Sequence, residues 1–180
     1  MSRDDDAKRF ADLVMPHLGD AYALAHWIVG NQADAEDVVQ EASLRAFRAL
    51  SGFAGGNVRA WVLTIVRHAA YSWLTKTKRS MLVAVDDLEA VERVQAARGG
   101  DTGSAATPET ELIARADAAR LEAAIAALPL QFREAVVLRD IQGLDYRDIA
   151  AVTAVPLGTV MSRLARGRRR LIDLIRADEP

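Results

Sequence analysis

Apolar residues recur at helical spacing along nearly the whole chain, whereas the alternating β-branched runs typical of strands are scarce. In the N-terminal half this pattern predicts three helices, over residues 6–29 with an interruption near Pro16 and Gly19, over 33–50, and over 58–78. The stretches between them, 30–32 and 51–57, contain glycines that end helices. Three helices with short connections predict a small bundle.

A polar, glycine-rich stretch then interrupts the pattern. Helices resume at Thr107 and Pro108, an N-cap followed by a proline suited to the first helical position. Two longer helices follow, stopped by Pro129 and near Gly143, and two shorter ones come after them. The predicted fold class is all-α, with two small helical domains: an N-terminal helical bundle over residues 1–79 and a C-terminal helix-turn-helix bundle over 109–180, joined by a flexible linker over 80–108.

Residues 144–171 have the layout of a helix-turn-helix. Asp145 is placed to cap a short helix, residues 153–156 form the turn, and Pro156 opens the second helix without losing a needed backbone donor. That second helix has two unlike faces. Its apolar face carries Leu157, Val160, Leu164, Leu171 and Ile175, and its opposite face carries Thr159, Ser162, Arg163, Arg166 and Arg170.

An arginine face opposite an apolar face is typical of a recognition helix, whose inner side packs while its outer side meets phosphates and base edges in a major groove. A solvated helix end is the alternative, because arginine near a C-terminus also suits the helix dipole. Arg168 and Arg169 lie off the outer face. The short helix and turn that come before the arginine face favour DNA binding.

The net charge of −2 conceals a strong segregation of charge. Residues 42–85 contain no carboxylate, and their lysines and arginines are interleaved with aromatic residues, a combination typical of surfaces that bind single-stranded nucleic acid. A helical wheel of residues 58–78 places Thr64, Arg67, His68 and Tyr71 on the outer face, and Trp61, Ile65, Ala69 and Trp73 on the inner face. Because most aromatic residues of a small bundle are core residues, Trp61 is assigned to the core, whereas Tyr71 stays open between the two roles.

Just upstream the sign of the charge reverses. Asp34, Asp37 and Glu41 share one stripe of a predicted helix at three- and four-residue spacing. Carboxylates early in a helix often serve only the helix dipole. These extend into the second turn, so a surface for a basic protein partner is a second interpretation.

Composition narrows the class of protein. A chain of 180 residues without cysteine has no disulfide, thiolate metal site or cysteine nucleophile, which is typical of the reducing cytoplasm. No apolar run approaches the ~20 residues of a membrane span, and the acidic N-terminus is unlike a signal peptide, so we expect a cytoplasmic protein with no membrane insertion. His17, His26 and His68 are scattered and no phosphate-binding loop appears, so we expect no enzymatic activity, no metal and no cofactor.

Four segments, in this order, resemble those of bacterial sigma factors of the extracytoplasmic-function (ECF) group: DAEDVVQEASLRAFRAL, RAWVLTIVRHAAYSWL, LPLQFREAVVLRDIQGLDYRDIA and GTVMSRLARGRRRL. The resemblance covers most of residues 10–78 and 112–174. It implies a factor that binds core RNA polymerase, directs promoter-specific transcription initiation at −10 and −35 promoter DNA elements, and is held inactive by an anti-sigma factor.

The resemblance also implies roles for the residues singled out above. Asp37, Gln40 and Glu41 match the segment that contacts the clamp of the polymerase's largest subunit, and Asp34 lies on the same stripe. Arg67 and His68, which share a face with Thr64 and Tyr71, match the segment that reads and opens the −10 element, and the loop ending at Asn57 lies close to it. Arg163 and Arg166 match −35 recognition positions, on the face that also carries Thr159, Ser162 and Arg170. The chain departs from the family at His68, where asparagine is frequent, and at Met161, where many members carry lysine or arginine.

Three rival functions are weaker. A plain helix-turn-helix regulator explains residues 112–176 but leaves the basic, aromatic stretch and the acidic stripe unexplained. A decoy that binds an anti-sigma factor without activating promoters normally carries a receiver domain, for which two helical domains in 180 residues leave no room. An enzyme lacks a recognisable constellation of catalytic residues.

Overall fold

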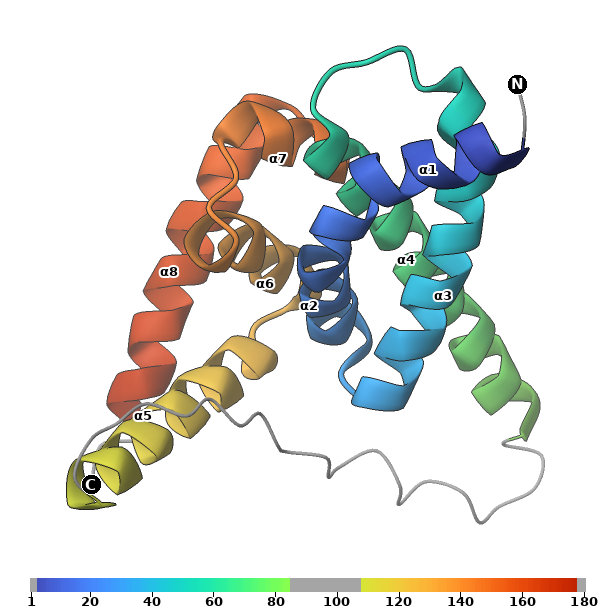
Figure 1. Ribbon diagram of the computed structural model, residues 1–180. Coiled ribbons are helices and arrows are strands. Elements are labelled where there is room, and N and C mark those ends of the chain that lie inside the picture. Colours follow the sequence, from blue (N-terminus) through green and yellow to red (C-terminus); the bar gives the residue numbers. More distant parts are fainter. Residues whose placement is uncertain (1–2, 85–107, 178–180) are drawn as a thin grey trace.

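The computed structural model describes residues 3–84 and 108–177, and every regular element in these two ranges is helical (Figure 1). The N-terminal domain consists of α1 (Arg3–Leu13), the turn η1 (Met15–His17), α2 (Leu18–Val29), α3 (Gln32–Ala49), the turn η2 (Leu50–Gly52) and α4 (Val58–Ala84). The C-terminal domain consists of α5 (Pro108–Ala127), α6 (Leu130–Val136), the π-helical turn η3 (Val137–Ile141), α7 (Tyr146–Thr153) and α8 (Leu157–Ala177). The all-α prediction is confirmed. Most of the predicted linker, residues 85–107, lies outside the described residues, and α4 continues past its predicted end.

Local signals set several helix ends. Gly30 ends α2 in the left-handed conformation at φ 90°, and the Asn31 side chain caps α3 by accepting the Asp34 N–H at 2.9 Å. Asp145 caps α7 in the same way, accepting the Asp148 N–H at 2.7 Å. Ala154 then turns the chain at φ 53°, so the predicted helix-turn-helix forms without a glycine at its turn.

The inner face of α4 differs from the wheel prediction. Its buried residues are Ala60, Val62, Leu63, Val66, Ala69 and Ala70. Of the residues predicted to face inward, only Ala69 is buried, while Trp61, Ile65 and Trp73 pack against the edge of the core and stay partly exposed. The reason is that α4 contacts α2 and α3 on one side and α7 on another, so its buried arc is wider than that of a helix in an isolated three-helix bundle.

The C-terminal domain holds α8 against α6 at close range. Val160 and Leu164 of α8 are buried, as predicted, whereas Leu157 is 44% exposed because it lies at the end of the helix beside the turn. Gly167 makes the close approach possible, since a Cβ atom there would lie 3.0 Å from Val136 Cγ2 and 3.3 Å from the Phe132 carbonyl oxygen. By itself, no described helix is long and apolar enough to cross a membrane; α7 and α8 meet that standard only when they are taken together across a bend of 100°.

The two domains pack directly against each other. Figure 1 shows α6 beside α2, with α7 near the start of α4. Buried residues from both domains, including Leu24, Val66, Leu138 and Ile149, belong to one hydrophobic cluster. The described residues therefore form a single closed body, in which one side of α4 faces the C-terminal domain.

We expect Gly167→Ala to destabilise the fold. Overpacking costs about 1–3 kcal/mol and outweighs the roughly 1 kcal/mol that alanine gains over glycine in a helix. Gly158→Ala is the control, because a Cβ atom there meets nothing within 4 Å. Urea unfolding followed by circular dichroism measures both variants. Equal midpoints for the two would show that α6 and α8 can separate without cost.

Candidate nucleic-acid interface

The predicted −35 residues lie on α8 and include two unpaired arginines. Arg166 is exposed and Arg163 is partly exposed, and neither pairs with a carboxylate among the described residues. Ser162 is exposed and its hydroxyl donates to the Thr159 carbonyl at 3.0 Å. These side chains leave a cationic strip with small hydroxyls on the side of α8 opposite Val160 and Leu164.

Other arginines of α8 contact the C-terminal domain itself. Arg168 donates to both oxygens of Asp140, from Nη2 at 2.6 Å and from Nε at 3.0 Å, and this hydrogen-bonded ion pair raises the pKa of Arg168. The guanidinium of Arg170, predicted on the outer face, lies 5.0 Å from the centre of the Phe132 ring. Arg163 and Arg166 are thus less engaged within the protein than Arg168 and Arg170.

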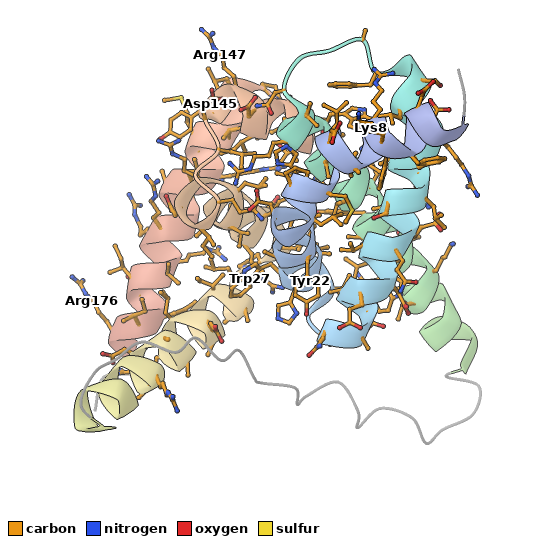
Figure 2. The ribbon with its side chains drawn as sticks, in the orientation of Figure 1. Lys8, Tyr22, Trp27, Asp145, Arg147 and Arg176 are labelled. Atoms are coloured by element: carbon orange, nitrogen blue, oxygen red, sulfur yellow. The ribbon has the colours of Figure 1, made fainter. Side chains whose placement is uncertain are left out.

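A hollow of about 430 Å³ lies at the start of α8, lined by Arg139, Asp145, Tyr146, Arg147 and Leu157. The Arg139 guanidinium lies 5.0 Å from the centre of the Tyr146 ring and donates to the Leu144 carbonyl at 2.7 Å. Figure 2 shows Arg147 extending away from the body beside α7 and Arg176 extending away at the far end of α8. The sequence analysis missed Arg139 and Arg147, whose nearness to α8 depends on the turn.

The predicted −10 residues on α4 lie at the boundary between the domains. His68 is exposed, whereas Thr64, Arg67 and Tyr71 are partly buried. Thr64 donates its hydroxyl to the Ala60 carbonyl at 2.8 Å. Asn57, just before α4, accepts the Ala60 N–H at 3.1 Å with its side-chain oxygen and therefore caps the helix.

Arg67 and Tyr71 converge on one carboxylate of the C-terminal domain. Arg67 Nε donates to Glu134 Oε1 at 2.5 Å, and Arg67 Nη2 donates to Oε2 at 3.4 Å. Tyr71 donates its hydroxyl to Oε2 at 3.3 Å, and its ring centre lies 4.5 Å from the Arg67 guanidinium. The Glu134 side chain is 0% exposed and that of Arg67 is 15% exposed. Burial, followed by the nearby Glu134 charge, raises the pKa of Tyr71, so its phenol stays a donor.

Further polar contacts cross the boundary on either side of this pair. Arg59 donates to the Gln142 carbonyl at 2.6 Å, and the Gln142 side chain donates to the Asp20 carbonyl at 2.8 Å. Arg59 also pairs with Asp20 of its own domain at 2.7 Å. Asn57 donates to the Asp148 carboxylate at 2.7 Å.

Arg133 adds a contact near Trp27, which Figure 2 places between α2 and the C-terminal domain. Its Nη1 donates to the Trp27 carbonyl at 3.0 Å. Sequence reasoning missed these interdomain partners. Glu134 carried a usable signal, because it is the one carboxylate between Phe132 and Leu138, where only Arg133 is also polar, but the sequence does not say which cation pairs with it.

The acidic stripe of α3 lies on the exposed side of the N-terminal domain. Asp37 and Gln40 are exposed, and Glu41 forms a 2.8 Å ion pair with Arg45, which lowers the pKa of Glu41 by hydrogen bonding and by its charge. Asp34 instead belongs to the helix cap with Asn31. Leu44, 54% exposed, extends the stripe by one turn. The stripe therefore joins free polar groups to an apolar residue, a combination found in protein interfaces.

No group of three or more histidines, aspartates or glutamates among the described residues is arranged to hold a metal ion.

Comparison with known proteins agrees with this geometry. Residues 13–80 match the family model of Sigma-70 region 2, and residues 118–171 match that of Sigma-70, region 4. The chain is 37% identical over 166 residues to the ECF RNA polymerase sigma factor SigE of Mycolicibacterium smegmatis, spanning 91% of this chain and 60% of that protein. It is 32% identical over 167 residues to the ECF RNA polymerase sigma-E factor of Escherichia coli K12, spanning 92% of this chain and 86% of that protein.

Two solved structures share the fold. The sigma factor RpoE in complex with the anti-sigma factor NepR from Bartonella quintana superposes with a TM-score of 0.76 at 28% identity, covering 96% of this chain and 99% of that one. CnrH in complex with the cytosolic domain of CnrY gives a TM-score of 0.63 at 26% identity, covering 94% of this chain and 89% of that one. With regions 2 and 4 in the same order and identity above 30% along most of the Escherichia coli protein, this chain belongs to the ECF sigma factors of bacterial RNA polymerase.

Proposed function

We propose that the chain binds core RNA polymerase and directs it to promoters, with α8 reading the −35 element and α4 reading and opening the −10 element. The observation that carries this function is the presence of sigma regions 2 and 4 in order in one chain. The proposal assigns no catalytic step to the chain itself, and it places the chain where RNA polymerase works, in the cytoplasm.

The proposed −35 site consists of Thr159, Ser162, Arg163 and Arg166, with Arg170 at its edge. Its support is that neither Arg163 nor Arg166 pairs with a carboxylate in the part of the chain that the structure describes, on a helix held by Gly167 at close range to α6. A guanidinium that is not already engaged can bond guanine edges or phosphates without first breaking a protein contact.

The proposed −10 site consists of Asn57, Thr64, Arg67, His68 and Tyr71. Cations and an aromatic ring on one helix face can hold the backbone and stack on an unpaired base. Melting costs a few kcal/mol per flipped base. Capture of the unpaired bases offsets part of this cost, and binding to the polymerase supplies the rest.

Asp34, Asp37, Gln40 and Glu41 form the proposed polymerase contact. The exposed, unpaired Asp37 beside exposed Leu44 supports it, since an interface needs groups that are not already satisfied within the protein. We extend the proposal to control by an anti-sigma factor, because two structures with this fold, RpoE and CnrH, were solved with NepR and with the cytosolic domain of CnrY.

Run-off transcription with core polymerase, followed by sequencing of the 5′ ends, tests the function. We expect discrete start sites that core polymerase alone does not give, each preceded by a shared pair of sequence elements. Promoter-independent products identical to those of core alone would contradict a sigma activity.

Arg163→Ala and Arg166→Ala are each expected to weaken −35-dependent initiation by about 1–3 kcal/mol, because each removes a base-edge contact. Arg176→Ala on the same helix is the matched control: it removes the same charge about 15 Å beyond Arg166 and about 20 Å beyond Arg163, at 1.5 Å per residue. Titration of run-off transcription against promoter concentration measures the change. If all three substitutions reduced activity equally, the effect would come from the net charge of the protein and not from contacts with bases of the −35 element.

Asp37→Arg is expected to reduce affinity for core polymerase by about tenfold or more, since a like charge replaces a complementary one at the interface. Glu36→Arg makes the same change on the neighbouring helix position, about a quarter-turn away around α3. Fluorescence anisotropy of labelled protein titrated with core polymerase compares the two, with circular dichroism to verify the helix content. Unaltered affinity for Asp37→Arg would mean that the carboxylate acts only within α3.

A further inference from the structure

We propose that the described arrangement is an autoinhibited state, in which the C-terminal domain covers the promoter-facing side of α4 and Glu134 occupies the place of a nucleic-acid phosphate. The inference rests on the proposed −10 role of α4. It adds a conformational control built from the chain's own residues, separate from any partner protein.

Glu134 engages the two kinds of group that single-stranded DNA would use. Its carboxylate receives the forked N–H groups of Arg67, at 2.5 and 3.4 Å, and a guanidinium fork binds carboxylate and phosphate by the same geometry. It also accepts the Tyr71 hydroxyl at 3.3 Å. The Tyr71 ring faces the Arg67 guanidinium at 4.5 Å and is not free to stack on a base. The Glu134 carboxylate thus binds both the cation and the aromatic side chain that would otherwise be available to DNA.

The same polarity repeats toward the start of α4. The Gln142 carbonyl accepts from Arg59, and the Asp148 carboxylate accepts from Asn57. In these contacts with α4 and with Asn57 just before it, the N-terminal domain donates and the C-terminal domain accepts, whereas the direction is reversed at α2, where Gln142 and Arg133 donate to the carbonyls of Asp20 and Trp27. A nucleic-acid backbone would likewise present hydrogen-bond acceptors, its phosphate oxygens, to the donors of α4.

We call the contact of Glu134 with Arg67 and Tyr71 the latch, and its burial explains how it can open. A fully buried carboxylate is tolerated because Arg67 pairs with it. When the domains separate, water solvates both groups, so the pair itself favours the closed state only weakly over the open one. Removing one partner is different, because the closed state then holds an unpaired buried charge while the open state does not. Loss of Glu134 should therefore shift the population toward the open state.

The first test measures binding of free protein to a short, fluorescein-labelled single-stranded DNA of mixed sequence at low salt. We expect Glu134→Ala to bind at least about tenfold more tightly than the unsubstituted protein, because affinity scales with the fraction of open molecules. Glu122→Ala, which removes an exposed carboxylate of α5, controls for net charge and should change affinity by no more than about twofold. Adding Arg67→Ala to Glu134→Ala should abolish the gain. Equal affinities for Glu134→Ala and Glu122→Ala would overturn the latch.

The second test measures the distance between the domains. The chain has no cysteine, so cysteines replacing Glu36 on α3 and Arg176 on α8 carry the only thiol-reactive dyes. We expect resonance energy transfer to fall in Glu134→Ala and not in Glu122→Ala. Transfer that is the same in all three proteins would contradict the proposal.

A third test does not remove a buried residue and decides the matter if Glu134→Ala fails to fold. Cysteines replace Asp20 and Ile141, two residues outside the proposed DNA and polymerase sites that lie on opposite sides of the boundary where Asp20 accepts from Gln142, the neighbour of Ile141, and a short bismaleimide reagent joins them. The comparison is the same protein capped at both cysteines with N-ethylmaleimide. We expect the cross-linked form to lose transcription with core polymerase relative to the capped form. Equal transcription by the two forms would refute the latch, whereas absence of specific transcripts from the unsubstituted protein would refute the proposed function instead.

Discussion

A single buried carboxylate, Glu134, depends on a cation from the other domain, and much of the structure follows from that dependence. Its side chain has no exposure to water, so the Arg67 guanidinium must stay within hydrogen-bond reach while the domains are closed. This requirement ties Glu134 of α6 to the middle of α4, while α6 itself packs on α2. Arg59 and Asn57, with their partners Gln142 and Asp148, then set the register along the rest of the boundary.

The same side chains serve two incompatible purposes. Groups suited to hold DNA are charged, forked or aromatic, and such groups are costly to leave unsatisfied when they are covered. The C-terminal domain satisfies them with a carboxylate, a backbone carbonyl and a second carboxylate. Given the proposed −10 role of α4, closure and promoter binding compete for this helix, and a partner that separates the domains favours promoter binding.

The C-terminal recognition helix is organised differently. Gly167 allows α8 to pack closely on α6, and Arg168 and Arg170 contact Asp140 and Phe132 within their own domain. Among the described residues, Arg163 and Arg166 pair with no carboxylate, so their guanidinium groups stay available on the opposite side of α8 in this arrangement. Under the proposed roles of the two helices, closure blocks the DNA-binding face of α4 and leaves that of α8 open.

The sequence by itself determined the helices, the caps at Asn31 and Asp145, the helix-turn-helix and the family, because these depend on short-range spacing and on residue types that act locally. It also identified the apolar and arginine faces of α8, whereas on α4 only Ala69 of the predicted inner face is buried. Tertiary structure alone decided that Arg67 meets Glu134, 67 positions away, and that Val62, Leu63 and Val66, rather than Trp61 and Ile65, fill the core. The physical reason is that pairing between distant groups depends on how two helical bodies dock, and helical periodicity carries no information about docking.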